Sequence, residues 1–336
     1  MNESALMQPA LIDRLQRRVT YLRLSVTDRC DFRCVYCMPE KMSFMPRTEV
    51  LTADELVRVA ESFVALGVTK IRLTGGEPLV RPDICTVVER LARIPKLQTL
   101  AMTSNGSRLS MLAQPLRDAG LQSLNISLDS LRQDRFKALT RTGNLQDVLA
   151  GIDAARDAGF TRIKLNAVLM RGRNDDEIID LVSFARREQL DISFIEEMPL
   201  GVIDEHERAL SFMSSGEVLD RVRQEFDLLP CLDSSEGPSR YYRMSDSRIR
   251  VGVISPHSNN FCASCNRVRM TATGRLLLCL GHEHGVDLRD IVRASPYDPA
   301  QLQQTILDAM PLKPDRHEFD LHQPPQIVRF MNTTGG

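Results

Sequence analysis

The sequence predicts an α/β fold built as an incomplete (β/α)6 barrel of the TIM type, with a smaller C-terminal domain covering its open side. Apolar runs rich in β-branched residues alternate with amphipathic stretches at intervals of roughly thirty residues, which requires a parallel sheet. A barrel and a doubly wound sheet both satisfy this alternation. Polar residues follow successive strands on one expected rim, and that placement favours the barrel.

Six apolar runs have the composition of strands, because they are rich in Val, Ile, Thr and aromatic residues. Six repeats in place of eight predict a barrel that stays open along one side. The expected strands cover residues 19–26, 68–74, 97–103, 123–128, 161–169 and 191–195.

Helical periodicity separates the expected strands. The two clearest apolar sets are Leu56, Val59, Phe63 and Leu66, and Leu145, Val148, Ile152 and Ala155. Thr52 with Glu55, and Asn174 with Glu177, have the spacing of capping boxes, in which two side chains satisfy free backbone N–H groups. These signals indicate where the helices begin.

Polar side chains follow the carboxyl end of each expected strand. In barrels this end forms the rim that carries the chemistry. The rim residues are Cys30, the Thr74-Gly75-Gly76-Glu77 segment, Ser104 with Asn105, Asp129, Asn166, and Glu196 with Glu197.

The chain changes character near residue 230. Residues 1–230 are expected to form the barrel domain, and residues 231–336 a C-terminal domain of shorter segments rich in Gly, Pro and Ser. Helical spacing returns at Leu302, Ile306 and Leu307. Residues 332–336 have the composition of a flexible tail.

Composition excludes several classes of protein. The 336 residues carry 43 basic and 44 acidic side chains, so the net charge of -1 argues against a general nucleic-acid or membrane-surface interaction. The N-terminus resembles neither a secretory signal nor a transit peptide. No stretch of about twenty apolar residues could span a bilayer. We therefore expect a cytoplasmic enzyme, in which any anionic ligand meets a local cluster of basic residues.

Three of the eight cysteines form a compact first group. Cys30, Cys34 and Cys37 follow a strand directly, with the spacing C-x3-C-x2-C. In a large chain of this class, cysteines serve as metal ligands or core thiols more often than as disulfides. Three thiolates suit a cubane iron-sulfur cluster with one open iron. A zinc site would need a fourth ligand, and no histidine lies in this segment.

The first group and the loop after the next strand resemble the two signature motifs of the radical S-adenosylmethionine superfamily. The motifs are CDFRCVYC at residues 30–37 and GGEP at residues 75–78. The resemblance implies a 4Fe-4S cluster on Cys30, Cys34 and Cys37 that cleaves S-adenosylmethionine to a 5′-deoxyadenosyl radical. It places Tyr36, Gly76, Ser127 and Met198 at the S-adenosylmethionine site. Without it, Met198 would be interpreted as a gap-filling core residue.

A second group of three cysteines lies in the C-terminal domain. Its members are Cys262, Cys265 and Cys279. A structural zinc with His282 or His284 as fourth ligand is one interpretation, because spacing alone does not identify the metal. Arg267 and Arg269 instead favour a site for a polyphosphate ligand beside the cysteines. Alternate residues of a strand point to one side, so the two arginines could clamp a polyphosphate.

From the first cysteine motif to the closing Gly335-Gly336 pair, the chain resembles the GTP 3′,8-cyclase family of molybdenum cofactor (molybdopterin) biosynthesis. The resemblance implies a lyase in which the deoxyadenosyl radical removes the ribose 3′ hydrogen of GTP and the sugar radical closes onto guanine C8, giving 3′,8-cyclo-7,8-dihydroguanosine triphosphate. It implies a second 4Fe-4S cluster on the second cysteine group. It assigns GTP contacts to Arg23, Arg72, Thr103, Lys164, Arg267, Val268 and Arg269, with Arg267 and Arg269 also catalytic.

The resemblance also implies partners: a low-potential electron donor such as flavodoxin or ferredoxin, a downstream pyranopterin synthase, and a second copy of the chain in a homodimer. It implies that the Gly335-Gly336 tail enters the active site. Lys70 is interpreted as a surface charge, and Cys85 as a buried thiol. No role is assigned to Cys231 or to residues 201–215.

One position departs from the family pattern. Ser193 stands where the family often has an arginine, which puts one phosphate contact in doubt. Two alternatives to the cyclase remain at this stage. A peptide-modifying radical enzyme would carry a longer, cysteine-richer C-terminal region, and a redox sensor or zinc-stabilised binding protein would need no GGEP loop.

Overall fold

The computed structural model describes residues 10–231, 237–295, 298–323, 325 and 327–335. Each of the six predicted strands is confirmed, with ends shifted by at most two residues. Their bounds are β1 Tyr21–Ser25, β2 Lys70–Thr74, β3 Thr99–Ser104, β4 Ser123–Ser127, β5 Ile163–Leu169 and β6 Asp191–Glu196.

The strands pair in parallel and in sequence order from β1 to β6, which confirms the incomplete barrel. Two more parallel strands extend this run: β10 (Arg267–Met270) beside β1, and β9 (Arg250–Ile254) beside β6. Antiparallel strands complete the edges of the described sheet, namely β7 Leu228–Pro230, β8 Arg240–Met244, β11 Arg275–Leu277 and β12 Gly285–Asp287. Strands on both sides of residue 230 therefore belong to one sheet.

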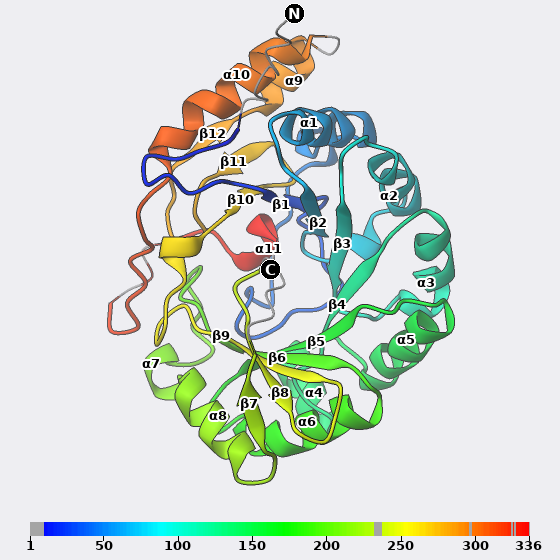
Figure 1. Cartoon of the computed structure of the whole chain (residues 1–336), viewed down its shortest axis with the longest axis vertical. Helices are drawn as coiled ribbons and strands as arrows, with labels where there is room; N and C mark the ends of the chain where they lie inside the picture. The colour runs from blue at the N-terminus through cyan, green and yellow to red at the C-terminus, as the bar shows by residue number, and fades with distance from the viewer. Residues whose placement is uncertain (1–9, 232–236, 296–297, 324, 326, 336) are drawn as a thin grey trace, which may run out of the picture.

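Helices cover the outside of the sheet (Figure 1). They are α1 Ala53–Ala65, α2 Ile84–Ala92, α3 Leu109–Asp118, α4 Gln133–Thr140, α5 Leu145–Asp157, α6 Ile178–Arg187 and α8 Ser215–Arg223. The predicted apolar faces are buried, since Leu56, Phe63, Val148 and Ile152 are at most 1% exposed. Burying a side chain of this size contributes about 1.5–3 kcal/mol.

One predicted capping box is confirmed and the other is wrong. The Thr52 hydroxyl accepts from the Glu55 N–H, and the Glu55 carboxylate accepts from the Thr52 N–H at 2.7 Å. Asn174 instead accepts from the Met170 N–H and donates to the Asp129 carbonyl, both at 2.8 Å. These partners replace the predicted cap. Asn174 thus links the loop after β5 to the loop after β4 by hydrogen bonds.

The C-terminal region adds α9 Arg289–Ala294 and α10 Pro299–Ala309, which packs against α1 and confirms the helical spacing around Ile306. The unassigned segment 201–215 contains the short α7, Arg208–Ser211. Short 3-10 turns are Arg47–Glu49, Pro78–Val80, Asp175–Glu177, Cys262–Ser264 and Met310–Leu312. Among the described residues, no helix is both long and apolar enough to cross a membrane.

The end of the chain lies inside the barrel. Residues Met331–Thr334 form α11, which Figure 1 shows within the ring of strands. Asn332 and Thr334 are at most 1% exposed. The prediction of a flexible tail is therefore wrong for residues 332–335, because these small polar side chains are buried against the rim.

Candidate functional site

The first cysteine loop leaves β1 and is held against the end of α4. The backbone N–H groups of Arg33 and Val35 donate to the carbonyls of Thr140 and Leu139, each at 2.9 Å. The Arg141 guanidinium donates to the Arg33 and Met38 carbonyls at 3.0 and 3.3 Å. These bonds hold residues 33–38 of the loop that carries the three thiols.

The first cysteine group lies in buried, acidic surroundings. Burial raises the pKa of all three thiols, and Glu77 adds to the shift at Cys30 as Asp129 does at Cys34. The pKa of Cys37 reaches about 12, although a backbone N–H from Asn332 opposes the rise. Without metal the site therefore favours neutral thiols, and bound cationic iron would supply the charge that thiolates need.

The GGEP loop packs directly on the first cysteine loop. The Gly76 N–H donates to the Thr27 carbonyl at 2.8 Å, and the Glu77 N–H donates to the Arg29 carbonyl at 2.7 Å. A Cβ at Gly76 would lie 2.2 Å from the Arg29 oxygen. The absence of a side chain at Gly76 therefore lets the two motifs meet, a role that the sequence had not indicated.

Glu77 is a buried carboxylate that joins two rim segments. It accepts from the Asn105 N–H at 2.6 Å and from the Ser104 hydroxyl at 2.8 Å. Burial raises the pKa of Glu77 to about 7, although these donors oppose the rise. Asn105 in turn donates to Asp31 in the first cysteine loop at 2.7 Å. Hydrogen bonds thus connect the GGEP loop, the loop after β3 and the first cysteine loop.

The structure places the four residues predicted for S-adenosylmethionine at or near this rim. The Tyr36 hydroxyl donates to Asp129 at 2.7 Å, which fixes the tyrosine beside the first group. Ser127 on β4 lies in register with Asn166 on β5. Asn166 has a buried side-chain oxygen without a partner in the described part of the chain. Met198, after β6, lines the large central cavity. A polar ligand here would satisfy Asn166.

A cavity of about 810 Å³ fills the barrel and extends to the second cysteine group. Basic residues line it in layers, because in-register residues of neighbouring strands face the same side. Arg269, Arg23 and Arg72 are in register across β10, β1 and β2. One layer away, Arg267, Tyr21 and Lys70 are in register across the same strands. Five cations thus meet in two layers.

The pKa values report a strongly positive potential in this cavity. Burial lowers the pKa of Arg23 to about 10, with repulsion from Arg72 and Arg267 adding to the shift. Burial and repulsion from Arg23 and Arg267 also lower the pKa of Arg269. Burial alone would raise the pKa of Tyr21, but Arg72, Arg23 and Lys70 lower it to about 7. A multiply charged anion would relieve this repulsion.

Other predicted GTP contacts lie around the same space. Lys164 lines the cavity, and its Nζ donates to the Tyr241 hydroxyl at 3.3 Å. Thr103 is in register with Asn125 and Lys164, and its buried hydroxyl has no partner among the described residues. Val268 is 1% exposed, packs in the core and borders the cavity.

The second cysteine group lies where the chain crosses the open side of the barrel. Residues 255–266 connect β9 to β10 and carry Cys262 and Cys265, while Cys279 follows β11. All three border the cavity. Burial alone would raise the pKa of Cys265, but Lys313 and then Arg267 lower it to about 7. Burial raises the pKa of Cys279, and Lys313 opposes that rise, so Lys313 acts on two thiols of the second group.

The positions of His282 and His284 bear on the alternative of a structural zinc at the second cysteine group. Within the described ranges, no group of three or more His, Cys, Asp or Glu side chains could hold one ion. In a cubane cluster each thiolate binds a different iron, so the thiolates need not converge on one point. The His282 Nε2 lies 2.8 Å from the Arg316 carbonyl, and His284 is exposed. These positions argue against the structural zinc.

The C-terminal segment reaches from the first group to the arginine layer. The Asn332 amide donates to the Asp28 carbonyl at 2.9 Å, and Arg269 donates to the Gly335 carbonyl. Gly335 has a φ of 76°, and a Cβ there would lie 1.9 Å from the Thr74 hydroxyl oxygen. Gly335 thus enters the site as the resemblance implied, and Gly336 lies outside the described residues.

Sequence reasoning missed several cavity residues. The interpretation of Lys70 as a surface charge is wrong, because Lys70 lines the cavity and its Nζ lies 5.1 Å from the Tyr21 ring centroid. Tyr21 and Tyr241 were not singled out at all. Strand alternation could have found Tyr21 and Lys70, since each lies two residues before a predicted arginine on its strand. Tyr241 gave no such signal, because β8 was not predicted.

The structure also places Ser193, Cys85 and Cys231, three residues outside the predicted site motifs. The Ser193 hydroxyl lies 2.9 Å from that of Ser239 in a closely packed contact. Arg250 on the neighbouring strand lines the cavity, where its guanidinium lies over the Tyr241 ring at 4.6 Å. Cys85 is only partly buried, so its interpretation as a buried thiol is wrong, and Cys231 is also partly buried.

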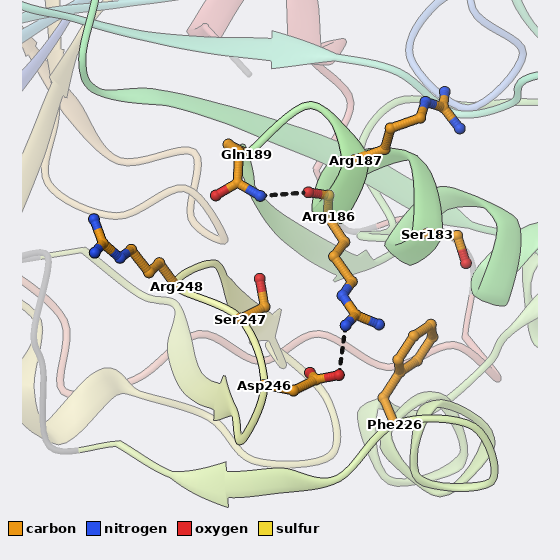
Figure 2. A pocket seen from close by; sticks show the side chains of 8 residues that line it. All are labelled: Ser183, Arg186, Arg187, Gln189, Phe226, Asp246, Ser247 and Arg248. Atoms are coloured by element: carbon orange, nitrogen blue, oxygen red, sulfur yellow. Dashed lines mark hydrogen bonds and ion pairs between the residues drawn. The ribbon is translucent and has the colours of Figure 1, made fainter.

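A second hollow, of about 660 Å³, lies beside the end of α6 and the turn before β9. Figure 2 shows Arg186 paired with Asp246, with Arg187 and Arg248 on either side. None of the predicted site residues lines it. The cavity in the barrel is therefore the candidate active site.

Comparison with known proteins agrees with this geometry. Residues 24–185 match the family described as Radical SAM superfamily, and residues 190–319 match Molybdenum Cofactor Synthesis C. The chain is 62% identical to the GTP 3′,8-cyclase of Pseudomonas entomophila, over 97% of this chain and 98% of that one. It is 61% identical to the GTP 3′,8-cyclase of Marinobacter nauticus, over 98% and 99% of the two chains.

Among solved structures, the chain is similar to Streptococcus suis SuiB bound to S-adenosylmethionine, with a TM-score of 0.58. The two are 16% identical, and the match covers 83% of this chain and 66% of SuiB, so it supports the fold alone. The full-length identity to the cyclases is far higher and covers both cysteine groups. The chain therefore belongs to the GTP 3′,8-cyclase family of the radical S-adenosylmethionine superfamily.

Proposed function

We propose that this protein is a GTP 3′,8-cyclase, which removes the ribose 3′ hydrogen of GTP and joins the 3′ carbon to guanine C8 in the first step of molybdenum cofactor biosynthesis. The observation that carries the proposal is the cavity itself. It joins a layer of three arginines, Arg269, Arg23 and Arg72, to the second cysteine group. The triphosphate of GTP matches the layer of three arginines. The guanine end of GTP would then lie toward the second cysteine group.

In this proposal the first cysteine group holds a 4Fe-4S cluster through Cys30, Cys34 and Cys37. When bound, that cluster and S-adenosylmethionine supply a hydrogen-abstracting deoxyadenosyl radical. Tyr36, Gly76, Ser127 and Met198 border the S-adenosylmethionine. The buried oxygen of Asn166 is available for a hydrogen bond to a hydroxyl or ammonium group. The described end of the chain excludes water from this side of the site.

The basic residues of the barrel bind and orient GTP. Arg23, Arg72 and Arg269 neutralise the triphosphate, and Arg267 with Lys70 extends this positive surface by one layer. Lys164 and Thr103 contribute further donors, and Arg250, which is paired with Asp191, also lines the cavity. Holding both ends of the nucleotide keeps the ribose at a fixed place between the two cysteine groups.

Cys262, Cys265 and Cys279 would hold the second 4Fe-4S cluster, which would supply an iron site without a cysteine for the guanine. Arg267 and Arg269 lie on β10, shortly after Cys265, and border the same cavity as the cysteines, so they are placed to hold substrate beside this group. Residues 1–230 and 231–336 divide these tasks, with radical formation in the first part and one wall of the substrate site in the second.

The reaction also implies partners. Cleavage of S-adenosylmethionine consumes one low-potential electron, which flavodoxin or ferredoxin would supply. The cyclised nucleotide would pass to pyranopterin synthase, and the family assignment supports a homodimer in the cytoplasm. Sedimentation at enzyme-assay concentrations tests the dimer, and a single species of monomer mass would refute it.

The decisive experiment combines the reconstituted protein with S-adenosylmethionine, dithionite and GTP under anaerobic conditions. We expect 5′-deoxyadenosine and a cyclised guanosine triphosphate to form in equal amounts. ATP in place of GTP should give neither product above the rate without nucleotide. If GTP does not stimulate 5′-deoxyadenosine formation, the proposed function is wrong.

A further inference from the structure

Lys313 is a deeply buried lysine that reaches the second cysteine group from behind. It follows the 3-10 turn Met310–Leu312 and is 2% exposed. Its Nζ donates to the Leu278 carbonyl at 2.6 Å and to the Arg267 carbonyl at 2.8 Å, and it lies 3.7 Å from the Cys265 Sγ. Lys313 does not border the cavity, so it does not touch substrate.

Arg17 makes a second clamp on the same cysteine group. It is 8% exposed, and its guanidinium donates to the Cys262 carbonyl at 2.8 Å. It also donates to the carbonyls of Pro314 and Asp315, the two residues after Lys313, at 2.6 and 2.8 Å. The buried Asp13 carboxylate holds Arg17 in place at 2.6 Å. Arg17 and Lys313 are therefore linked through one short segment.

Together the two cations contact each cysteine of the group or the residue directly before it. Arg17 binds the carbonyl of Cys262 itself. Lys313 contacts the Cys265 thiol and binds the carbonyl of Leu278, which directly precedes Cys279. A cluster needs its three thiolates at fixed separations, and outer residues that hold the ligand backbone reduce the cost of ordering them.

The charge of Lys313 also needs a counter-ion. Within the described part of the chain, no carboxylate forms an ion pair with Lys313. A buried ammonium is costly unless an opposite charge compensates it. Its polar contacts are two carbonyls and the Cys265 sulfur. The nearest group that can carry a negative charge is therefore the second cysteine group.

We propose that Lys313, together with Arg17, is a positioning residue for the second iron-sulfur cluster. It sets the separations of the three thiols before iron arrives, and its positive charge compensates the thiolate charge of the finished cluster. This inference rests on the proposed function, because it requires that the second group holds a cluster. It predicts that Lys313 affects the second cluster and leaves the first unchanged.

The test isolates each cluster in a separate background. Replacing Cys30, Cys34 and Cys37 by Ala leaves only the second site, and replacing Cys262, Cys265 and Cys279 by Ala leaves only the first. Lys313→Met is placed in each background, with Lys137→Met on the exposed face of α4 as the matched charge-removal control. The readouts are iron retained against a chelator, the midpoint potential of the cluster, and the melting temperature of the metal-free protein.

We expect Lys313→Met to weaken iron retention at the second site by about 10-fold or more, as loss of an outer partner typically does. The midpoint potential should move to a more negative value, because a nearby positive charge has been removed. Lys313→Gln keeps a hydrogen-bond donor without the charge, so it should restore retention in part and leave the potential low. Lys137→Met should match the parent in every readout.

Three outcomes overturn the inference. Unchanged retention and potential at the second site would show that Lys313 does not act on the cluster. Equal losses at both sites, with a lower melting temperature of the metal-free protein, would show a general structural role. In the third outcome, Lys313→Gln and Lys313→Met retain iron equally, and both give the midpoint potential of Lys137→Met. Neither the hydrogen-bond donor nor the charge of Lys313 would then matter. Absence of a second cluster even with Lys313 intact would instead refute the proposed function.

Discussion

The two cysteine groups have the same number of thiols in opposite electrostatic surroundings. The first lies near Glu77 and Asp129, which add to the effect of burial and raise the pKa values of its thiols. The second lies near Lys313 and Arg267, which lower the pKa of Cys265. Local charge tunes the reduction potential of a cluster.

This difference teaches how one ligand set can serve two tasks. Negative surroundings make a bound cluster harder to reduce and a stronger electron donor, which suits the cleavage of S-adenosylmethionine. Positive surroundings attract an anionic nucleotide and suit a cluster that holds substrate. Four changes test this contrast, in order of decreasing expected effect.

The largest effect is expected from removing one thiol of either group. Cys34→Ala should abolish 5′-deoxyadenosine formation, because the first cluster loses a ligand. Cys265→Ala should abolish the cyclised nucleotide while slow cleavage of S-adenosylmethionine continues. Chromatographic measurement of both products separates the two losses. Retained cleavage in Cys34→Ala, or loss of all cleavage in Cys265→Ala with the first cluster intact, would remove the contrast.

The next effect concerns the arginines beside the second group. Changing Arg267 or Arg269 to Ala removes charge-assisted contacts worth about 1.5–3 kcal/mol each. GTP affinity should therefore fall by about 10-fold to 100-fold per arginine. Equilibrium binding to the metal-free protein measures this loss, with the exposed Arg187→Ala as control. Equal affinities in the control and the Arg269 variant would place the triphosphate elsewhere.

A smaller effect is expected at Gly335. A Cβ there would clash with Thr74, and the positive φ adds strain of about 1–3 kcal/mol. Gly335→Ala should reduce product formation by about 10-fold while both clusters stay bound. Gly159 has a φ of 77° and no neighbouring atom within 4 Å of where a Cβ would lie, so Gly159→Ala shares the strain without the clash. Similar activity of the two variants would show that the tail does not shape the site.

The smallest effect is a pH dependence of GTP binding. The pKa of Tyr21 is about 7, so its hydroxyl loses a proton as the pH rises through neutrality and the cavity gains a negative charge. GTP affinity of the metal-free protein should then fall by about threefold relative to Tyr21→Phe. The affinities of the parent and of Tyr21→Phe are measured from one pH unit below this pKa to one pH unit above it. Their ratio at each pH removes the contribution from protonation of GTP itself, because both proteins bind the same GTP. A constant ratio would contradict the positive potential assigned to this layer.

The fold was predictable where one local signal sufficed. Strand composition and helical spacing located β1 to β6, and the capping pair Thr52–Glu55 located α1. The rim followed from strand order alone, since parallel strands end at one edge. The strand β9 was missed, and the strand expected at Arg267 and Arg269 was not predicted to join the barrel sheet, because short strands next to Gly, Pro and Ser resemble loops and pair only with residues distant in the chain.

The site was predictable for residues in motifs and less so for residues that depend on the barrel interior. Both cysteine groups and the Arg267–Arg269 pair came from spacing. Lys70 was misplaced, because a lysine at the start of a strand has the same sequence appearance whether it faces solvent or a lumen. Lys313 carried no signal at all, since its three contacts come from segments at least 35 residues away.

The division between the two groups can be tested most directly by magnetic resonance. In the protein with Cys30, Cys34 and Cys37 replaced by Ala, only the second cluster can form, and GTP labelled at the guanine nitrogens can be added to it. We expect a 15N hyperfine coupling between the reduced cluster and a guanine nitrogen of the labelled GTP, and a 14N coupling in its place with unlabelled GTP. A cluster spectrum that GTP leaves unchanged would contradict the assignment of the second group to substrate binding.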